Sequence, residues 1–560
     1  MNVEKYLEPK IAPRGVFDAL LERNDRVRFK VARPLGGWDD VTWGAFADQI
    51  RELSLFLRAG GMKAGDTAAV FASNSVAWGA AALAIQAAGG VMVPVYPAST
   101  ADQAAYVIEH AEARFVFLGA ALLEKVADRA ERYGAVVRFV TLDDVTAGKA
   151  AIDARIGDRV VSYAGARAMG AARHAKDPAE FLRTMHGVPL EAPGLMLYTS
   201  GTTGNPKGVP LTHANVAANG KDWFVCNAPV LEEDVTDLLW LPMSHIFGLG
   251  ELCIGNTLGW TSYLIDPASV MAKLPEVAPR VFMSVPAYWE KISIEAQKAA
   301  DPRARLKELT GGNLRFCLSG GAGLKREVKD FFHDAGILIV EGYGLTETSP
   351  TLTLNRPDAF RFDTVGRPLP SVEIRLAEDG EILAKGPNVF GGYHKDAAAT
   401  KEAFTDDGWF KTGDVGRFTP DGFLQIIDRK KDILVTAGGK NVPPVNIEAR
   451  FGDDPLISHA VVYGDAKRYL VAGFWVTEPI TPATRVRVQE RVDRVNESLA
   501  SYETVKRFAL FDRPLTVEGG FLTAALKVRR RKIYDSFRAD FEALYEAPAA
   551  ADSPPKETHP

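Results

Sequence analysis

A short segment after an apolar run combines hydroxyl groups, glycines and one lysine, the groups that can enclose a phosphate. Residues 197–208 read Leu-Tyr-Thr-Ser-Gly-Thr-Thr-Gly-Asn-Pro-Lys-Gly. Glycines let the backbone approach closely, amides and hydroxyls donate hydrogen bonds, and the lysine supplies positive charge. The pattern is not the P-loop G-x-x-x-x-G-K-[ST], because Lys207 precedes Gly208 rather than a serine or threonine. A flexible surface turn is the alternative, and the ordered pattern up to a helix start at Thr212 argues against it.

Two further segments carry groups that suit a nucleotide and a metal ion. Glu341–Thr348 leaves an apolar run, and the carboxylate of Glu347 is the hard oxygen ligand that Mg²⁺ takes alongside substrate phosphates. The alternative is a helix N-cap by Thr346 with Glu347 in the first turn, and the two roles are compatible. Asp414 is flanked by glycine in Gly408–Gly416, where a carboxylate can accept both ribose hydroxyls or simply occupy a turn.

Taken in order along the chain, these segments resemble the motifs of the adenylate-forming superfamily, which includes acyl-CoA synthetases, luciferases and the adenylation domains of peptide synthetases. The resemblance extends from about Val41 to Lys532. It implies ATP as a substrate, together with Mg²⁺, and it assigns a set of residues to ATP or AMP. These are Thr199, Ser200, Gly201, Thr202, Thr203, Gly204, Lys207, Gly320, Gly321, Ala322, Gly342, Tyr343, Gly344, Thr346, Asp414 and Arg429.

The resemblance also implies individual roles. Tyr343 matches the residue that stacks on adenine, Thr346 matches the one that touches the α-phosphate, and Glu347 matches the magnesium ligand. The run at 320–323 resembles the adenine-lining loop, although a glycine cluster after a strand is a weak signal by itself. Its last residue is glycine where proline is commoner in the family, which leaves the backbone role intact. Asp414 matches the residue that accepts the ribose hydroxyls, and Arg429 would also face the ribose or phosphate.

A lysine near the end of the chain is implied to be catalytic. Leu522–Val528 resembles the segment with the family's adenylation lysine, which is Lys527 here. A mobile cation is needed because a carboxylate must approach the α-phosphate, and two anions repel each other. Lys431 matches the family's hinge position, although an isolated lysine in a charged run would indicate only a solvated loop. By analogy, Gly438 and Gly439 border the channel for the pantetheine arm of coenzyme A.

The segment Leu241–Gly248 resembles the wall of the acyl pocket, with His245 near the reacting carboxylate. The implied catalytic set is Lys527, His245, Thr346 and Glu347. Small residues that could leave room for an aliphatic chain follow at Gly248, Gly250 and Gly255. Amino-acid-activating relatives carry an aspartate just after this region to bind the amine. Here only Glu251 is acidic nearby, so an amino-acid substrate is disfavoured.

Three further segments resemble long-chain fatty acyl-CoA synthetases, whereas His245–Leu252 departs from the common long-chain version. The three are Val285–Ile292, Ile426–Asp432 and Thr436–Val442. We therefore predict an AMP-forming acid–thiol ligase that joins a long- or medium-chain fatty acid to coenzyme A through an acyl-adenylate. The alternatives are a fatty acyl-AMP ligase that loads a carrier protein, a ligase for aryl or other carboxylates, and a catalytically silent nucleotide- or lipid-binding protein.

Apolar strand-like runs alternate with helical patterns through the first three quarters of the chain, which predicts an α/β fold with largely parallel sheets. Short strands and turns from Val365 to Ile427 predict a small β subdomain. The expected organisation is a large N-terminal domain of doubly wound sheets plus this subdomain, and a small mobile α+β C-terminal domain. The predicted boundaries are 1–428 for the AMP-binding or adenylation domain, 429–432 for the hinge, 433–546 for the lid domain and 547–560 for a disordered tail.

The uncharged stretch Thr67–Ala101 is predicted to be a buried strand–helix–strand unit rather than a membrane span, because it is rich in Ala and Gly and contains polar residues. Its parts are Ala68–Ala72, Val76–Ala88 and Val91–Val95. A strand at Leu314–Leu318 and a helix at Leu324–Ala335 are expected further along. Two apolar stripes near the end of the chain also predict helices. They are Val488, Val492, Val495 and Leu499, and Ile533, Phe537, Phe541 and Tyr545.

Length and composition limit the class of protein. A chain of 560 residues needs two or more domains, and a net charge of −5 argues against nucleic acid as the main partner. Three cysteines without metal-ligand spacing argue against a disulfide framework or zinc site. The first residues lack the apolar core of a signal peptide, so a cytoplasmic location is expected. The run Arg529–Lys532 is predicted to be a solvated helix start, with CoA phosphates or a membrane surface as alternatives. Peripheral membrane contact and a homodimer both stay open.

Overall fold

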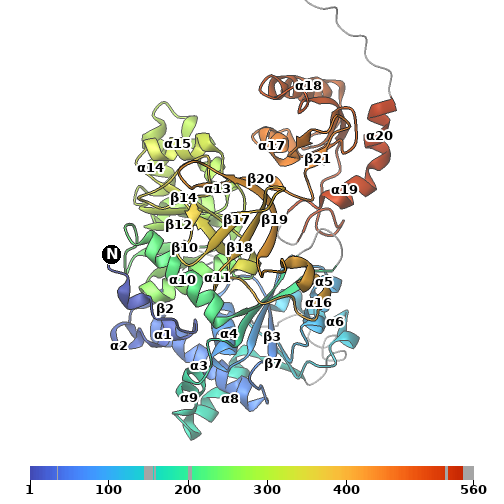
Figure 1. The fold of residues 1–560 in the computed structure, drawn as a ribbon. Helices are drawn as coiled ribbons and strands as arrows, with labels where there is room; N and C mark the ends of the chain where they lie inside the picture. Colours follow the sequence, from blue (N-terminus) through green and yellow to red (C-terminus); the bar gives the residue numbers. More distant parts are fainter. Residues whose placement is uncertain (34–35, 144–155, 157–158, 200–204, 524–526, 547–560) are drawn as a thin grey trace, which may run out of the picture. The chain divides into compact units, whose positions relative to one another are not determined.

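The computed structural model of the chain describes residues 1–33, 36–143, 156, 159–199, 205–523 and 527–546. The predicted tail lies outside these residues. The chain divides into two units (Figure 1). The larger unit contains Met1–Gly201, Asn205–Thr412 and Gly416–Ile426, and the smaller unit contains Gly413–Val415 and the chain from Ile427 onward.

A seven-stranded sheet in the larger unit has the order β7-β6-β5-β3-β4-β8-β9, in which the neighbours are parallel except β8 and β9. Alternate residues of β3 face opposite sides, since Ala68 and Val70 belong to one apolar cluster and Phe71 to another. Helices α3 and α4 cover the first side, and α5 and α6 cover the second (Figure 1). The sheet is therefore doubly wound, as predicted. Its elements are β3 Thr67–Phe71, β4 Val91–Val95, β5 Phe115–Leu118, β6 Arg138–Thr141, β7 Val160–Ser162, β8 Pro193–Thr199, β9 Lys207–Thr212, α3 Trp43–Ala59, α4 Val76–Ala87, α5 Ala101–His110, α6 Leu123–Ala127, α8 Tyr163–Lys176 and α9 Glu180–His186.

The predicted strand–helix–strand unit corresponds to β3, α4 and β4, and each bound agrees to within one residue. Ser75 caps α4 by accepting the N–H of Trp78 at 3.0 Å. Within the described residues, no helix has the length and hydropathy needed to cross a membrane.

A nine-stranded sheet in the same unit has the order β16-β15-β14-β13-β12-β10-β11-β1-β2. The strands from β14 to β1 in this order are parallel, and the strands at the two ends are antiparallel. Thr212 caps α10 by accepting the N–H of Asn215 at 3.0 Å, which confirms the predicted helix start. The predicted helix Leu324–Ala335 corresponds to α15, which begins at Arg326. The elements are β1 Val27–Ala32, β2 Trp38–Thr42, β10 Thr236–Leu239, β11 Thr261–Leu264, β12 Val281–Ser284, β13 Phe316–Ser319, β14 Ile339–Gly344, β15 Thr351–Leu354, β16 Arg367–Pro368, α1 Arg14–Phe17, α2 Leu20–Arg23, α10 His213–Asn227, α11 Ile246–Leu258, α12 Val270–Val277, α13 Pro286–Gln297, α14 Pro302–Thr310 and α15 Arg326–Asp334.

A four-stranded sheet with the order β17-β18-β19-β20 follows, where the sequence predicts a small β subdomain. Its elements are β17 Glu373–Leu376, β18 Glu381–Lys385, α16 Ala397–Ala403, β19 Phe410–Phe418 and β20 Leu424–Arg429. The short 3-10 helices in the described part of the chain are η1 Glu4–Tyr6, η2 Ala120–Leu122, η3 Ala130–Arg132, η5 Pro267–Ser269, η6 Thr346–Thr348 and η7 Ala449–Phe451.

The smaller unit is built on the three-stranded sheet β23-β24-β25. Val488, Val492 and Val495 of α18 are buried in the apolar cluster that also holds residues of this sheet, as the first predicted stripe requires. The second stripe falls on two helices, because the chain leaves helical geometry at Phe537, where φ is −112° and ψ is 19°. The elements are β21 Leu434–Val435, β22 Asn441–Val442, α17 Pro444–Glu448, β23 Ile457–Tyr463, β24 Leu470–Val476, α18 Pro482–Asn496, β25 Val505–Phe511, α19 Arg530–Ser536 and α20 Arg538–Glu546.

The charged run at 529–532 is only partly solvated, which corrects the prediction. Arg530 donates to Oε2 of Glu448 at 2.6 Å, and the two side chains are only 10% and 14% exposed. Glu448 also accepts the N–H of Val462, so this ion pair ties α17 and α19 to β23. Neighbouring residues could not reveal the burial, because Glu448 lies 82 positions earlier in the chain.

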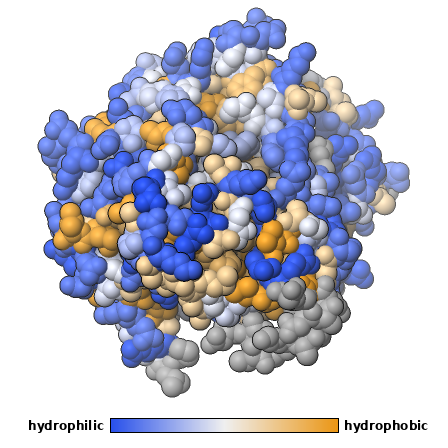
Figure 2. Space-filling view, turned by 90° about the horizontal axis from the view of Figure 1, so that it is seen from below, coloured by the Kyte–Doolittle hydropathy of each residue, from blue (hydrophilic) through white to orange (hydrophobic). Residues whose placement is uncertain are grey.

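The face of the molecule in Figure 2 carries apolar residues in separate small areas between hydrophilic ones. The larger unit's exposed large apolar side chains come from different helices: Leu21 lies in α2, Met169 in α8, Leu182 in α9, Val225 in α10 and Ile294 in α13. Single exposed apolar side chains are ordinary on protein surfaces and point to no particular partner.

Candidate active site

The predicted phosphate loop joins two antiparallel strands of the larger unit. β8 ends at Thr199 and β9 begins at Lys207, and these two residues are paired directly across the hairpin. A hydroxyl residue and a cationic residue therefore stand at the neck of the loop, an arrangement that suits a bound anion. The predicted loop residues that lie outside the described part of the chain are Ser200, Gly201, Thr202, Thr203 and Gly204.

Lys207 and Glu347, predicted to bind phosphate and magnesium, both contact Tyr393. Glu347 lies in η6 and is only 8% exposed. The hydroxyl of Tyr393 donates a 3.0 Å hydrogen bond to Oε1 of Glu347, and Nζ of Lys207 lies 4.8 Å from the centre of the tyrosine ring. A cation over an aromatic face is attracted by the ring's electron density. The structure thus brings two predicted residues together through a third that the sequence analysis missed.

The position of η6 is set by the segment between β18 and α16. The side-chain amide of Asn388 donates to the carbonyl oxygens of Thr348 and Thr351 at 2.8 and 2.9 Å, and the backbone carbonyl of Asn388 accepts the hydroxyl of Ser349 at 2.8 Å. The N–H of Phe390 donates to the carbonyl of Glu347 at 2.9 Å. The second half of the short helix and the residues after it are therefore held by hydrogen bonds to the 388–390 segment.

The predicted adenine segments meet at one edge of the nine-stranded sheet. β12, β13 and β14 are parallel neighbours, in which Ser319 pairs with Ser284 on one side and Glu341 on the other. Residues that follow these strands emerge at the carboxyl edge, where ligands of open α/β sheets bind. The loop at 320–322 and the strand end at 342–344, which contains Tyr343, are therefore neighbours.

Gly344 allows a close approach of two chain segments at this edge. A Cβ atom at this position would lie 1.8 Å from the carbonyl oxygen of Pro350. Any side chain would therefore force β14 away from the start of β15, whose Thr351 pairs with Gly344. This close approach keeps Tyr343 and η6 on the same short turn of chain.

His245, the predicted contact of the reacting carboxylate, is the N-cap of α11. Its Nδ1 accepts the N–H of Phe247 at 3.1 Å, so the neutral ring carries its proton on Nε2. The preceding segment is held by Asn74, whose amide donates to the carbonyl of Leu241 at 2.8 Å and accepts the N–H of Met243 at 2.9 Å. The ring nitrogen that remains a donor can serve a carboxylate oxygen.

The acyl segment and the adenine loop are in contact. A Cβ atom on Gly320 would lie 3.0 Å from Cε1 of Phe247, which places the phenylalanine ring directly against the loop. Phe247 is two residues from His245, so the predicted carboxylate contact and the predicted adenine contact share one region of the larger unit. The two segments are far apart in the sequence, so this contact cannot be read from the local pattern of either one.

Only one of the three glycines predicted to leave room for an acyl chain faces open space. Nothing lies within 4 Å of a Cβ built on Gly250. A Cβ on Gly248 would instead lie 2.5 Å from the carbonyl oxygen of Pro242, and one on Gly255 would lie 2.8 Å from the guanidinium of Arg28. The prediction is therefore wrong for Gly248 and Gly255, which allow close packing of α11.

Glu251 does not offer a charge for an amine. Its side chain is fully buried in α11. Burial raises its pKa well above the ordinary value, and the nearby Asp237 raises the pKa further. Both effects favour the uncharged carboxyl. The expectation that an amino acid is a poor substrate is consistent with this geometry.

Asp414 and Arg429 form an ion pair, with Nε of Arg429 at 2.9 Å from Oδ1 of Asp414. The aspartate side chain is 7% exposed and the arginine side chain 56%. Lys431 follows in an exposed turn, in which the N–H groups of Asp432 and Ile433 donate to the carbonyl of Arg429 at 3.0 and 3.1 Å. The predicted hinge residue thus sits directly beside a predicted nucleotide residue.

Lys527, the predicted adenylation lysine, has an exposed side chain. Its N–H donates to the hydroxyl of Thr523 at 3.1 Å, and its carbonyl accepts the N–H of Thr523 at 2.8 Å. Partial loss of water around the amino group lowers the pKa of Lys527, the Arg429 cation lowers it further, and Asp414 opposes both effects. The amine therefore lies within the electrostatic reach of both members of the ion pair.

The glycines predicted to border the CoA channel lie in the turn between β21 and β22. Gly439 has φ of +72°, a conformation that residues with a side chain rarely adopt. Its N–H donates to the carbonyl of Thr436 at 2.8 Å, and Gly438 and Gly439 are both exposed. The turn leaves a backbone surface without side chains, which a narrow ligand could follow.

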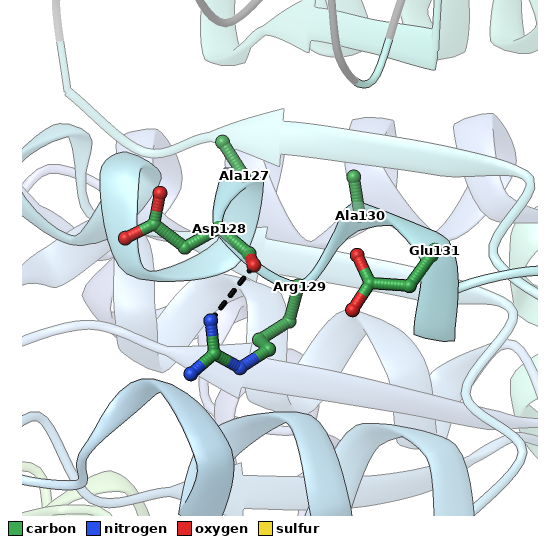
Figure 3. A pocket seen from close by; sticks show the side chains of 5 residues that line it. All are labelled: Ala127, Asp128, Arg129, Ala130 and Glu131. Carbon is green, nitrogen blue, oxygen red and sulfur yellow. Dashed lines mark hydrogen bonds between the residues drawn. The ribbon is translucent and has the colours of Figure 1, made fainter.

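Two hollows on the larger unit are formed by other residues. One, of about 590 Å³, is lined by Ala127–Glu131, where Arg129 donates to the carbonyl of Asp128 (Figure 3). Arg129 also donates to Asp102 at 2.6 Å. The other, of about 510 Å³, includes Asn74 and the start of α4. Neither hollow is lined by a predicted catalytic residue, so neither one marks the candidate active site.

Comparison with known proteins places the chain in a family. The family of AMP-binding enzymes matches residues 18–394, and the AMP-binding enzyme C-terminal domain matches residues 431–549. A long-chain-fatty-acid–CoA ligase of Mycobacterium bovis is 33% identical over 91% of this chain and 93% of the relative. The long chain acyl-CoA synthetase 1 of Arabidopsis thaliana is 27% identical over 90% of this chain and 87% of the relative. The chain belongs to the AMP-binding enzyme family, the adenylate-forming superfamily that its motifs resemble.

Solved structures agree on the fold. The adenylation domain of a carboxylate reductase from Mycobacterium chelonae superimposes with a TM-score of 0.82 at 22% identity, covering 97% of this chain and 93% of that domain. The o-succinylbenzoate CoA synthetase of Bacillus subtilis in complex with AMP superimposes with a TM-score of 0.71 at 22% identity, covering 93% and 98%. The predicted α/β architecture with a large N-terminal and a smaller C-terminal domain is confirmed.

Proposed function

We propose that the protein is an ATP-dependent, AMP-forming acid–CoA ligase whose acid is a long- or medium-chain fatty acid. The observation that carries this proposal is the contact of Phe247 with Gly320, because the segment that we propose to line the acyl pocket packs against the loop that we propose to line the adenine. The fatty acid as substrate is supported by the relatives at 27–33% identity, which are named as fatty-acid–CoA ligases or acyl-CoA synthetases.

The first half-reaction would join the acid to AMP. A carboxylate oxygen attacks the α-phosphate of ATP, the new acyl O–P bond forms, and the bond to pyrophosphate breaks. The Nε2–H of His245 donates to the carboxylate and orients it. Lys207 and Lys527 supply positive charge to the phosphates where negative charge accumulates in the transition state.

The residues present fit a magnesium ion. Among the described residues, no group of three or more His, Cys, Asp or Glu side chains gathers as a metal cage. Mg²⁺ is commonly held by one or two carboxylates together with substrate phosphates, and Glu347 would supply the carboxylate. When bound, the ion neutralises phosphate charge and aligns the pyrophosphate leaving group.

The second half-reaction would transfer the acyl group to coenzyme A. The thiol sulfur attacks the acyl carbonyl, a thioester forms, the bond to AMP breaks, and the thiol proton is released. We propose that Lys431 is the pivot that changes the surface presented by the smaller unit, and that Gly438 and Gly439 then border the pantetheine arm. The three cysteines are free thiols, which suits the reducing cytoplasm that we propose as the location.

The test is a product analysis over a series of acids. Pyrophosphate release is measured with acids from acetate to oleate and with cinnamates, and products are identified by mass spectrometry. We expect acyl-CoA from medium- or long-chain acids only when ATP, Mg²⁺ and coenzyme A are all present. Acyl transfer to a holo-carrier protein but not to coenzyme A would replace this proposal with an acyl-AMP ligase. A preference for cinnamates would mean that the substrate is an aromatic acid rather than a fatty acid. Absence of pyrophosphate release with every acid would overturn the proposal.

A further inference from the structure

Tyr393 contacts two charged groups that come from different parts of the chain. Its hydroxyl donates to Oε1 of Glu347 in η6 at 3.0 Å, while its ring faces Nζ of Lys207 in β9 at 4.8 Å from the ring centre. One side chain therefore uses its polar end on the carboxylate and its aromatic face on the cation. Under the proposed function these two groups are the metal ligand and a phosphate contact.

The ring of Tyr393 is itself held firmly. The backbone N–H of Tyr393 donates to the hydroxyl of Thr400 at 2.9 Å, and the backbone N–H of His394 donates to the carbonyl of Gly208 at 2.9 Å. Gly208 follows Lys207 in β9, so the tyrosine backbone is anchored beside the lysine that its ring contacts. The ring also packs against Phe390, with centroids 4.9 Å apart and planes inclined by 69°.

We propose that Tyr393 is a positioning residue that sets the orientation of the Glu347 carboxylate and the location of the Lys207 ammonium for Mg·ATP. The proposal rests on the proposed function for the identity of the ligand. The hydroxyl acts on Glu347, whereas the ring acts on Lys207. These two effects belong to different atoms of one side chain, so substitution can separate them.

Orientation matters because Mg²⁺ demands near-ideal octahedral geometry. A hydrogen bond to one oxygen fixes the plane of a carboxylate, and loss of such outer partners typically reduces metal affinity about 10- to 100-fold. The cation above the ring is held by attraction to the aromatic face, which limits the positions that a long, flexible lysine side chain can take. Both effects change the binding of the triphosphate and the metal, and neither changes the binding of adenine.

A packing role is the competing explanation, because Tyr393 also contacts the apolar cluster around Phe390. Tyr393→Phe keeps the ring and removes only the hydroxyl, so it preserves packing and the contact with Lys207. Tyr393→Leu removes the hydroxyl and the aromatic face together. The matched control is Tyr163→Phe, which removes a phenol that donates to Gln49 at 2.7 Å in another part of the larger unit.

The readout is nucleotide binding by calorimetry on the full chain, and no acid is needed. Affinity for α,β-methylene-ATP is measured with Mg²⁺ and with EDTA, and affinity for AMP is measured with EDTA. The ratio of the two analogue affinities is the gain due to Mg²⁺. We expect Tyr393→Phe to reduce this gain by about 10-fold or more while affinity in EDTA stays unchanged. Tyr393→Leu should in addition weaken the analogue in EDTA, with AMP affinity and the Tyr163→Phe control unchanged.

Two outcomes would overturn the proposal. A Tyr393→Phe protein whose gain from Mg²⁺ lies within twofold of the wild type would show that the hydroxyl does not orient the metal ligand. A parallel loss of AMP affinity and thermal stability in Tyr393→Phe would assign the residue to packing. These results are separable from failure of the proposed function, because a protein that activates no acid can still be tested for metal-dependent binding of the ATP analogue.

Discussion

The amino group of Lys329 lies 2.6 Å from Oε2 of Glu341, and the two side chains are only 3% and 4% exposed. The other carboxylate oxygen, Oε1, accepts the N–H of Leu324 at 2.8 Å. Glu341 therefore joins α15 and the loop after β13 to the strand that leads into Tyr343. Burial raises the pKa of Glu341, while the Lys329 cation and the hydrogen bonds lower it.

Removing the cation alone should destabilise the larger unit. Lys329→Met leaves a buried carboxylate without its partner, which typically costs about 3–5 kcal/mol in the free energy of unfolding. Because Glu341 also holds Leu324, AMP affinity should fall as well. The double variant Lys329→Met with Glu341→Gln should recover most of the stability, since no buried charge remains. Urea denaturation and calorimetric titration with AMP measure the two effects.

An exposed ion pair provides the matched control. Arg183 and Asp177 are 61% and 43% exposed, so Arg183→Met should leave the free energy of unfolding close to that of the wild type. If Lys329→Met were as mild as this control, the buried pair would not hold the adenine loop in place.

The local pattern of the chain predicted the elements well, because strand and helix periodicity depends on nearby residues. Val91–Val95 is an apolar run with the length of a buried strand, and β4 has those bounds. Thr212 precedes Asn215 with capping-box spacing, and α10 starts there. Patterns of this kind require no knowledge of the rest of the chain.

The missed features all depend on contacts between distant segments. Nothing near Tyr393 in the sequence shows that its ring and hydroxyl reach Lys207 and Glu347. Arg530 lies in a run of charges that is typical of a solvated surface, and its burial depends on Glu448. Gly255 resembles a gap for a ligand until Arg28 is placed beside it. Sequence patterns identify residue types that can do chemistry, whereas their partners are set by the sheet order.

His213 should make stability depend on pH. It is the first residue of α10, and burial lowers its pKa to about 4. Its unfolded pKa is about 6.5, so the folded chain prefers the neutral ring. The contribution of the neutral His213 ring to the free energy of unfolding is fully present above pH 6.5 and is lost as the pH falls from 6.5 toward 4. The total loss is about 3 kcal/mol, because each pH unit in this range costs about 1.4 kcal/mol.

Urea denaturation at pH 7.5, 6, 5 and 4 measures this loss. His213→Gln removes the titrating group, so the advantage of the wild type over this variant should shrink as the pH falls. His186→Gln changes an exposed histidine and should follow the wild type at every pH. A constant difference between wild type and His213→Gln would mean that His213 does not titrate in this range.

Lys431→Pro should separate the two proposed half-reactions. Proline fixes its own φ and restricts the preceding residue, so the exposed turn after Arg429 should lose the freedom that a pivot needs. Acyl-adenylate formation should persist, measured as pyrophosphate release in single turnover, while thioester formation should slow. Lys431→Ala removes the charge and keeps backbone freedom, so its effect should be smaller. Unchanged overall turnover in Lys431→Pro would discard the hinge assignment.

Lys527→Ala should have the opposite effect. The amine is expected to stand between the carboxylate and the α-phosphate only in the first half-reaction, where two anions approach each other. Removing one charge-stabilising donor typically costs about 10²–10³-fold in rate, so ATP–pyrophosphate exchange should fall by at least that factor. Thioester formation from supplied acyl-adenylate should survive, because the acyl carbonyl is then already activated and AMP leaves as the thiol attacks.

The control for Lys527→Ala is Lys532→Ala, which removes an exposed lysine from α19 in the same unit and should leave both half-reactions unchanged. Circular dichroism and thermal unfolding check that both variants fold. Equal loss of both half-reactions in a folded Lys527→Ala protein would contradict a role for Lys527 in the first half-reaction alone. Removing a charge that is needed only for adenylation should not slow the thiol's attack. Loss confined to adenylation would mean that Lys527 acts on the phosphate in the first half-reaction and is not needed for the thiol's attack.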